Sequence, residues 1–306
     1  MEGRYDKIPE EHVLCLWLNL IHNVQGKSHD LRVIYESFDV ISDKELTLSR
    51  NAFNNLRRLL TSDILIGSYH SYKKCLFVLV RSPYQFIKAS IEEMIGKGDF
   101  FYLTSNELET SNLKNIIFNS NSLHFLNYGH PLRFKESLAL CNAFKSLIIA
   151  SGNRLEDYIV ETSMVLAMYG VRKARDLDYS TRSDGDINST YDAIERHSPL
   201  WTKFYDCPIN ELISNPSNYF VFNGLKFISL ERLLQYKKCR YDVSKEYKDS
   251  IDIKAINKLL EGKDSNIFFF ILRVKLLLYR HIREIESRIK DMIKNILIKL
   301  HLYRSA

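Results

Sequence analysis

The sequence predicts an α+β protein of two domains followed by a basic helical tail. Segments with apolar residues at helical spacing alternate with short β-rich runs along most of the chain. An Asn-Gly pair separates two β-rich runs within residues 219–228, which predicts a β-hairpin. Within the tail of residues 266–303, residues 282–300 repeat apolar positions every three or four residues among basic ones, which predicts an amphipathic helix.

Length and composition set the frame for this prediction. The chain has 306 residues, which suggests about two domains, and we place the three parts at residues 1–135, 136–262 and 263–306. Apolar residues make up 45% and charged residues 26% of the chain, as in folded soluble proteins. The five cysteines are scattered without a CxxC pair, so we expect reduced thiols and no zinc site. Residues 1–12 lack the apolar core of a signal peptide, so we expect a cytoplasmic protein.

The first part is expected to be a small α/β domain of unknown role. Apolar spacing predicts helices over residues 9–24 and 43–60, with Ser42 as a cap of the second. Strands that alternate with helices are typical of an α/β layer. The other expected elements are strands over residues 64–68, 74–80, 100–104 and 122–127, and helices over residues 83–95 and 107–118.

Residues 123–131, with the sequence LHFLNYGHP, hold two histidines at the junction between the expected domains. His124 and His130 are either part of a phosphate-contacting loop or hydrogen-bonded structural groups at a strand end. Residues 134–149 predict one helix, or a helix followed by an apolar strand, that joins the two halves.

Residues 157–179, with the sequence DYIVETSMVLAMYGVRKARDLDY, carry the strongest chemical signal. They predict a short strand, a turn at Thr162-Ser163, a helix of two turns that ends at Gly170, and a second strand that presents Asp176 and Asp178. Alternate residues of a strand share a face, so the two carboxylates project together about 7 Å apart. They either hold a divalent cation such as Mg²⁺ or Mn²⁺, or lie on a solvated strand end.

This segment resembles the signature of the polymerase-β-like nucleotidyltransferase superfamily. In that family a strand enters a Gly-Gly or Gly-Ser turn, a short helix follows, and an Asp-apolar-Asp-apolar strand comes about ten residues later. The acidic strand fits this pattern, and the lead-in Tyr169-Gly170-Val171-Arg172 is similar to that of small members. Thr162 departs from it, because it stands where the family prefers Gly and its Cβ would crowd a phosphate at the backbone. The resemblance implies a mixed sheet with flanking helices over residues 136–262.

The resemblance also implies a third carboxylate from a neighbouring strand. Residues 179–197 form a polar, turn-rich segment after the acidic strand. Asp186 is the first candidate in it and Asp192 the second. The alternative is that both are turn and helix-cap residues, which Asp favours.

The segment after the expected hairpin resembles the part that follows the catalytic sheet in many small nucleotidyltransferases. Its pattern is a strand, a Leu-Glu-x-Leu-Leu helix, Lys-x-x-Arg and a Lys-Asp-x-x-Asp-Ile helix. The resemblance implies that phosphates are bound by cations and that Asp249 and Asp252 cap or orient the second helix. The implied phosphate-binding cations are Arg172, which we rank first, and Lys237, Arg240 and Lys248. The alternative is that these basic residues form a solvated helix face.

The tail carries the excess charge of the whole chain. Residues 265–306 hold nine Lys/Arg and three Asp/Glu, which equals the net charge of +6 of the full sequence. A dense apolar run over residues 267–279 is too short and too charged to span a bilayer. The basic amphipathic pattern that follows is typical of a helix at an anionic membrane surface. The alternatives are a helix packed on the protein itself or on a second copy.

The sequence contains no GxxxxGK[ST], GxGxxG, HExxH or GxSxG motif. The resemblance implies a metal-dependent transferase that uses a nucleotide-activated donor to place a nucleotidyl or phospho-group on a glycan or lipid-linked glycan acceptor. Its likeness to proteins of capsule and lipopolysaccharide assembly implies work at the inner membrane surface, without specific nucleic acid. The alternatives are a non-catalytic scaffold subunit of the same fold and a nucleotidyltransferase of a toxin–antitoxin pair.

Overall fold

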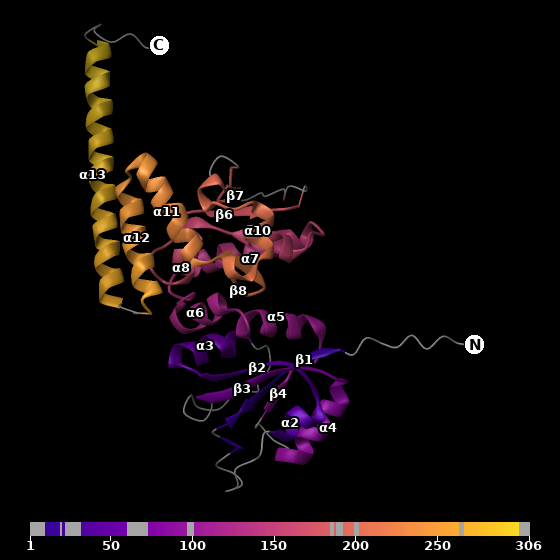
Figure 1. The fold of residues 1–306 in the computed structure, drawn as a ribbon. Coiled ribbons are helices and arrows are strands. Elements are labelled where there is room, and N and C mark those ends of the chain that lie inside the picture. The colour runs from indigo at the N-terminus through magenta and orange to yellow at the C-terminus, as the bar shows by residue number, and fades with distance from the viewer. Residues whose placement is uncertain are drawn as a thin grey trace.

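The computed structural model of the chain describes residues 10–18, 20–21, 32–59, 73–96, 101–183, 187, 192–198, 202–262 and 266–299. It holds two β-sheets, each covered by helices (Figure 1). Helices α5 (Glu107–Ile117) and α6 (Ser120–Tyr128) lie between the two sheets. The protein therefore contains both helices and sheets, packed against each other in layers, which confirms the α+β class.

The first sheet is antiparallel in all its described pairings and has the strand order β2-β3-β1-β4. Its antiparallel pairing corrects the expected α/β layer, in which strands would run parallel. Helices α3 and α5 pack on one face, and α2 and α4 pack on the other. The elements are β1 (Glu11–Trp17), α2 (Arg32–Ser37), β2 (Asp39–Thr47), α3 (Arg50–Leu59), β3 (Lys74–Arg81), α4 (Tyr84–Ile95) and β4 (Phe101–Leu103).

Strand β1 corrects the helix expected over residues 9–24. Its side chains alternate between two cores, with Val13 and Cys15 in one and Leu14 and Leu16 in the other. A strand buried on both faces reads as a continuous apolar run, which periodicity alone does not separate from a buried helix.

The helix expected over residues 43–60 is also wrong in its first part. Residues 39–47 form β2, an edge strand whose side chains alternate between exposed and half-buried, and α3 begins only at Arg50. The strands over residues 74–80 and 100–104 and the helices over 83–95 and 107–118 are confirmed within a few residues. The strand expected over residues 64–68 lies outside the described residues.

Helix α6 replaces the strand expected over residues 122–127. Asn119 caps it by accepting a hydrogen bond from the backbone N–H of Ser122 at 2.9 Å. Ser122 Oγ then accepts from the backbone N–H of Val221, so α6 is anchored to the second sheet. His124 lies on the same helix, and its Nδ1 and Nε2 lie 3.1 Å from Tyr169 Oη and 3.0 Å from Leu259 O. Burial lowers the pKa of His124, which acts here as a structural link.

The second sheet is mixed and has the strand order β7-β6-β5-β9-β8. Strand β5 pairs antiparallel with β6 and parallel with β9, and β6 pairs parallel with β7. The predicted hairpin is confirmed, because Asn223 and Gly224 between β8 and β9 take φ of 53° and 76°. The strands are β5 (Tyr158–Val160), β6 (Leu177–Thr181), β7 (Ile194–Arg196), β8 (Tyr219–Phe222) and β9 (Leu225–Ile228).

Helices cover both faces of this sheet and share its core. Residues 135–150 form one helix, α7, so the alternative of a helix followed by a strand is wrong. The described elements are α7 (Lys135–Ala150), η2 (Leu155–Asp157), α8 (Thr162–Met168), η3 (Lys203–Tyr205), α10 (Ile209–Ser214), η4 (Pro216–Asn218), α11 (Leu230–Ser244) and α12 (Tyr247–Leu260).

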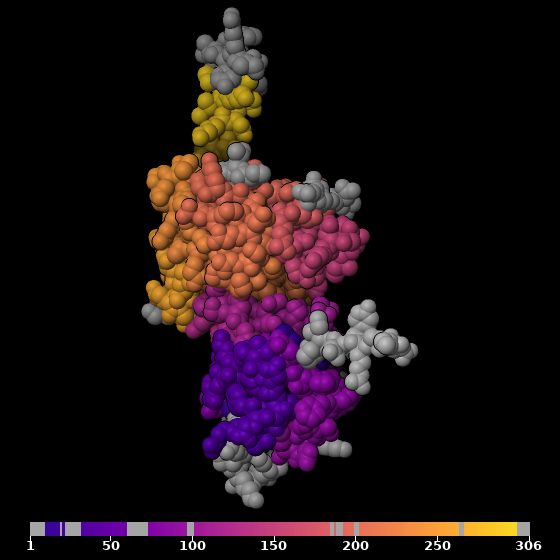
Figure 2. All heavy atoms as spheres, turned by 45° about the vertical axis from the view of Figure 1, so that its right-hand side comes forward, coloured from indigo at the N-terminus to yellow at the C-terminus, as the bar shows by residue number. Residues whose placement is uncertain are grey.

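The tail forms a single helix, α13 (Asn266–Lys299), of 34 residues. Its first half packs on α12, and its second half projects beyond the body of the protein (Figures 1 and 2). Within the described residues, no helix has the length and apolar character required to cross a membrane.

Candidate functional site

A polar cavity of about 360 Å³ lies where β6, β7, α8, α11 and α12 meet. It gathers seven of the side chains that the sequence singled out, although they are spread over 87 residues of the chain. Those seven are Thr162, Ser163, Asp176, Asp178, Lys237, Arg240 and Lys248, and the other lining residues are Glu195, Arg196, His197, Ser198 and Tyr236.

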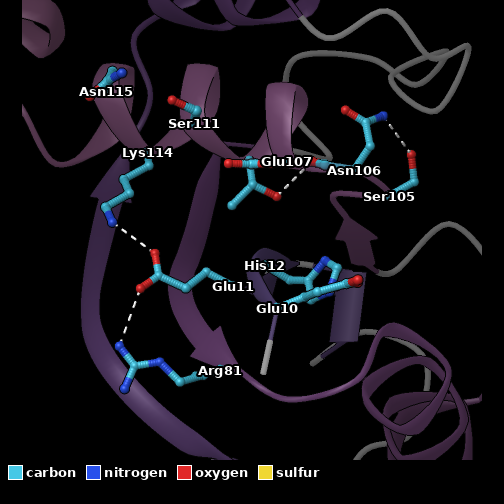
Figure 3. A pocket seen from close by; sticks show the side chains of 11 residues that line it. Glu10, Glu11, His12, Arg81, Ser105, Asn106, Glu107, Ser111, Lys114 and Asn115 are labelled. Atoms are coloured by element: carbon cyan, nitrogen blue, oxygen red, sulfur yellow. Dashed lines mark hydrogen bonds and ion pairs between the residues drawn. The ribbon is translucent and has the colours of Figure 1, made fainter. Parts of the chain in front are cut away.

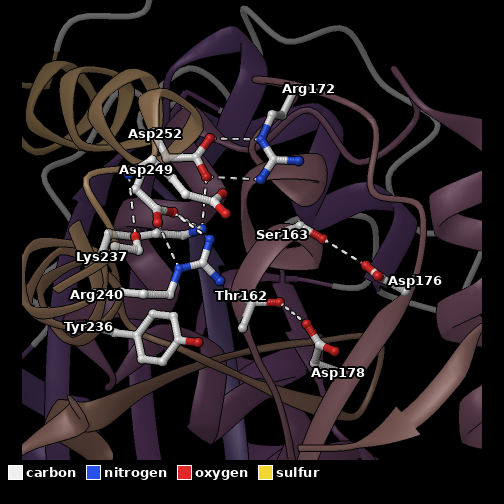
Figure 4. Close-up of polar contacts among 12 residues, drawn as sticks. Thr162, Ser163, Arg172, Asp176, Asp178, Tyr236, Lys237, Arg240, Asp249 and Asp252 are labelled. Carbon is white, nitrogen blue, oxygen red and sulfur yellow. Dashed lines mark hydrogen bonds and ion pairs between the residues drawn. The ribbon is translucent and has the colours of Figure 1, made fainter. Parts of the chain in front are cut away.

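The two predicted carboxylates enter the cavity from one edge of the sheet (Figure 4). Asp176 immediately precedes β6 and Asp178 is its second residue. Leu177 and Tyr179 point to the opposite side and are 0% and 3% exposed in the core. The alternation of a strand therefore places both acids on the cavity side.

Thr162 and Ser163, the first two residues of α8, lie next to these acids. Thr162 Oγ1 donates a hydrogen bond to Asp178, and Ser163 Oγ donates one to Asp176 at 3.3 Å (Figure 4). Thr162 has φ of 53°, a left-handed conformation that a β-branched residue rarely adopts. The backbone here thus has the form that a glycine favours, and Thr162 accepts that form while its hydroxyl binds Asp178.

The Asp178 carboxyl is held in an environment that disfavours its charge. Burial raises its pKa, the Thr162 hydrogen bond lowers it, and the nearby charge of Asp176 raises it again, so that the net shift is upward. A cation between the two acids would relieve this repulsion and favour the ionised form of Asp178.

Glu195 is a cavity-lining carboxylate on the neighbouring strand β7. It pairs with Asp178 in the parallel β6–β7 ladder, so both side chains share one face of the sheet. Asp192 lies in a turn before β7 and is not among the residues that line the cavity. Asp186 lies outside the described residues. Glu195 was missed because residues 194–196 show too little alternation to identify a three-residue strand.

A further acidic residue, Glu161, lies behind the cavity wall and binds the lining residue His197. Glu161 is fully buried, and its carboxylate accepts hydrogen bonds from His197 Nδ1 and, at 2.8 Å, from the Tyr205 hydroxyl. Its other oxygen, Oε1, has no hydrogen-bond partner among the described residues. His197 Nε2 lies 3.4 Å from the Tyr236 hydroxyl at the cavity wall. A carboxylate therefore fixes the orientation of an imidazole whose other nitrogen faces the cavity side.

The cationic side of the cavity comes from α11 and from the first turns of α12. Ser229 caps α11 by accepting from the backbone N–H of Arg232, and Leu233 and Tyr236 bury its apolar face. Lys237 and Arg240 follow on α11, on the side that faces α12. The acidic residues in the first turns of α12 also interact favourably with the dipole of that helix.

These cations meet two fully buried acids, Asp249 and Asp252, in one network (Figure 4). Lys237 Nζ lies 3.0 Å from Asp249 and 2.9 Å from Asp252. Arg240 binds both oxygens of Asp249 at 2.7 Å. Burial would raise the pKa of Asp252, but the charges of Arg172 and Lys237 outweigh it and hold that pKa well below its usual range. The two acids thus organise the cations, beyond the capping role that the sequence suggested.

Arg172 occupies a different place from the one expected. Its Nε and Nη2 bind the two oxygens of Asp252 at 2.7 and 2.9 Å, and the residue is 5% exposed. It is not among the residues that line the cavity. The prediction that ranked it first among phosphate contacts is therefore corrected, because this bidentate pair makes it a support of the cationic wall.

Lys248 is the cavity cation for which no carboxylate partner is found in the described part of the chain. Burial, together with the nearby charges of Arg172 and Lys237, lowers its pKa to about 8. An anion in the cavity would offset both effects.

The donor set of this cavity fits a magnesium ion that a ligand completes. Mg²⁺ typically takes one or two protein carboxylates and fills its other positions with water and substrate phosphates. Asp176 and Asp178 supply the two carboxylates. Among the described residues, no group of three or more His, Cys, Asp or Glu side chains is placed to hold a metal by itself.

A larger cavity of about 1090 Å³ lies on the first sheet, at β1 and α5 (Figure 3). Its central feature is Glu11, which pairs with Arg81 at 3.3 Å and with Lys114 at 2.8 Å. His12 is bonded through Nδ1 to the backbone oxygen of Thr104. These charges are already satisfied by one another, so the smaller cavity with its unpaired lysine is the better candidate site.

Neither the scan against protein-family models nor the search of curated proteins finds a match to this chain. The site is therefore interpreted from its own geometry.

Proposed function

We propose that the cavity binds a phosphate-bearing donor with a divalent cation and transfers a nucleotidyl or phospho-group. The observation that carries this proposal is the meeting of two adjacent carboxylates with a cationic wall in one cavity. Asp176 and Asp178 supply the anionic side, and Arg240 and Lys248 supply the cationic side. Such a polarised cavity suits a metal–polyphosphate complex, in which metal and phosphates carry opposite charges.

The chain's own groups divide the work in this proposal. Asp176 and Asp178 would hold Mg²⁺ or Mn²⁺, which would neutralise charge on the phosphates as the bond to the leaving group breaks. Lys248 and Arg240 orient the phosphate oxygens from the other side. Arg172 and Lys237 hold the wall in place through Asp252. Catalysis then rests on positioning and charge, as in phosphoryl transfer generally.

His197 is the group placed to receive the proton of an attacking acceptor hydroxyl. Its Nδ1 is bound to Glu161, which leaves Nε2 as the nitrogen that exchanges a proton with the cavity. Glu195, next to Asp178 on the sheet, is the candidate for the third carboxylate. We expect His197→Asn to lower turnover while donor binding stays within about twofold, because imidazole acts on the acceptor. Equal loss of binding and turnover would refute this role.

The acceptor and the setting follow from the sequence resemblance. The likeness of residues 218–231 and of the basic amphipathic tail to proteins of capsule and lipopolysaccharide assembly supports a glycan or lipid-linked glycan acceptor. A cavity of about 360 Å³ holds the phosphates and sugar of a donor, so the acceptor would approach at its open rim.

The decisive experiment measures ligand-dependent stability. Thermal shifts are recorded with Mg²⁺ and a panel of nucleotides for the wild type, Asp176→Asn/Asp178→Asn, and the control Glu156→Gln, which changes an exposed acid near η2. A ligand that binds only the folded protein raises its stability by RT ln(1 + [L]/Kd). We expect a Mg²⁺-dependent shift that the control keeps and the double variant loses. Equal shifts in the double variant would refute the proposed metal site.

The second candidate function is a non-catalytic subunit that binds the same ligand. Thr162 supports it, because its Cβ stands at the turn where a phosphate would approach the backbone and its hydroxyl is bound to Asp178. The two candidates differ in turnover. Release of pyrophosphate or nucleoside monophosphate in the presence of acceptor glycans would exclude the non-catalytic role, and tight binding without product would exclude the transferase.

A further inference from the structure

Helix α13 has two apolar sides, and only one of them packs on the protein. Phe269, Leu272 and Leu276 are 0%, 5% and 4% exposed in the core formed with α12. At 100° per residue, these three lie within an arc of about 60°. A helix that only covers its own domain would be polar on the remaining side.

The opposite side carries a continuous exposed ridge. Its members follow one another every three or four residues and lie within an arc of about 80°. From first to last the ridge is about 44 Å long at 1.5 Å per residue. We define the ridge as Ile267, Ile271, Val274, Leu278, Ile282, Ile285, Ile289, Met292 and Ile296, which are all between 38% and 75% exposed.

The ridge faces away from the rest of the molecule. The centre of its arc lies about 150° around the helix from the centre of the buried arc. Figure 2 shows that the second half of α13 stands clear of the body. A flat surface can therefore touch the part of the ridge in the second half of α13 without meeting the domains.

The charged residues of α13 indicate which kind of surface the ridge binds. Residues 266–299 hold eight Lys/Arg and three Asp/Glu, a surplus of five positive charges. Lys275 and Arg288 are exposed close to the two edges of the ridge. Basic side chains in this position extend from an apolar stripe towards anionic headgroups. A second copy of the helix offers the same positive edges, whereas anionic headgroups offer partners for Lys275 and Arg288, so charge favours an anionic lipid surface over self-association.

We propose that the ridge of α13 docks the protein on an anionic lipid surface, with the helix parallel to the membrane plane. The apolar ridge enters the boundary between headgroups and acyl chains, and Lys275 and Arg288 at its edges bind the headgroups. This proposal is independent of the chemistry in the cavity.

The test is flotation of the full-length protein with lipid vesicles. One vesicle type is phosphatidylcholine alone and the other is phosphatidylcholine mixed with phosphatidylglycerol. The variants are Ile285→Ser/Ile289→Ser on the ridge and the control Ile298→Ser, which changes an apolar residue that is 41% exposed and lies off the ridge. Circular dichroism checks that each variant keeps its helix content.

We expect wild type and Ile298→Ser to float with the mixed vesicles and the ridge variant to bind at least tenfold more weakly. Added salt should weaken binding, because the headgroup contacts are screened. Equal flotation of ridge and control variants, or equal binding to both vesicle types, would overturn the proposal. A dimer in light scattering that the ridge variant loses, without flotation of the wild type, would also overturn it and assign the ridge to contact between copies. None of these outcomes depends on the cavity, so they leave the proposed transfer function untouched.

Discussion

Lys248 gives the sharpest quantitative prediction for the cavity. Its pKa of about 8 means that about nine tenths of the side chains are charged at pH 7 and about one tenth at pH 9. If only the charged form binds phosphate, the apparent Kd of a Mg²⁺–nucleotide complex rises about tenfold between these pH values. Lys248→Met keeps the length of the side chain and removes its charge, so that variant should show weaker binding at pH 7 and little further change at pH 9.

The same substitution should raise stability, which separates a binding role from a structural one. The folded protein lowers the pKa of Lys248 from 10.5, so its unfolded state holds the proton more tightly and wild-type stability increases as pH rises from about 8 towards 10.5. In Lys248→Met this increase disappears, and the variant should be more stable than wild type at pH 7, because a half-buried cation among other cations is gone.

Isothermal titration calorimetry at pH 7 and pH 9, with urea unfolding at the same pH values, measures both effects. Lys254→Met is the matched control, since Lys254 is exposed on the same helix and does not line the cavity. We expect the control to keep the wild-type pH dependence. A tenfold change with pH that persists in Lys248→Met would refute the assignment, as would a loss of stability in that variant.

Two further predictions concern the residues around the cavity. Asp252→Asn should destabilise the protein by about 3–5 kcal/mol in urea unfolding, because Arg172 and Lys237 lose a buried partner; Asp242→Asn, in an exposed pair, should change stability by less than about 0.5 kcal/mol. A cost below about 1 kcal/mol for Asp252→Asn would contradict the network. Thr162→Gly and Thr162→Val both lose the hydroxyl bond to Asp178, but only glycine relieves the left-handed conformation, so Thr162→Gly should be about 1 kcal/mol more stable than Thr162→Val in urea unfolding. Equal stability of the two variants would show that the conformation of Thr162 carries no strain.

The elements that the sequence predicted correctly have strong local signals. The hairpin at Asn223-Gly224 needs positive φ at both residues, and few other pairs satisfy this. Helix α5 begins after Asn106, which accepts from the backbone N–H of Glu109, a cap that is visible in the sequence. The elements that were missed lack such signals. Strand β1 is buried on both faces, and the apolar residues of α6 serve contacts with two sheets.

The candidate site was predictable where neighbours in sequence act together. Asp176 and Asp178 share a face because they lie two residues apart, and the hydroxyls of Thr162 and Ser163 bind them. Glu195 and His197 were missed, since their place depends on the pairing of β7 with β6. The pair formed by Arg172 and Asp252 was also hidden, because 80 residues separate the partners.

The sequence by itself determined the hairpin at Asn223-Gly224, the two adjacent acids and the basic amphipathic tail, because each depends on residues within a few turns of one another. Only the tertiary structure decided which basic residues face Asp176 and Asp178 and which form buried ion pairs. It also decided that α13 packs through Phe269 and Leu272 and leaves the ridge uncovered. The physical reason is that charge pairing and burial depend on distances across the fold, and these are set by how the sheet and helices pack together.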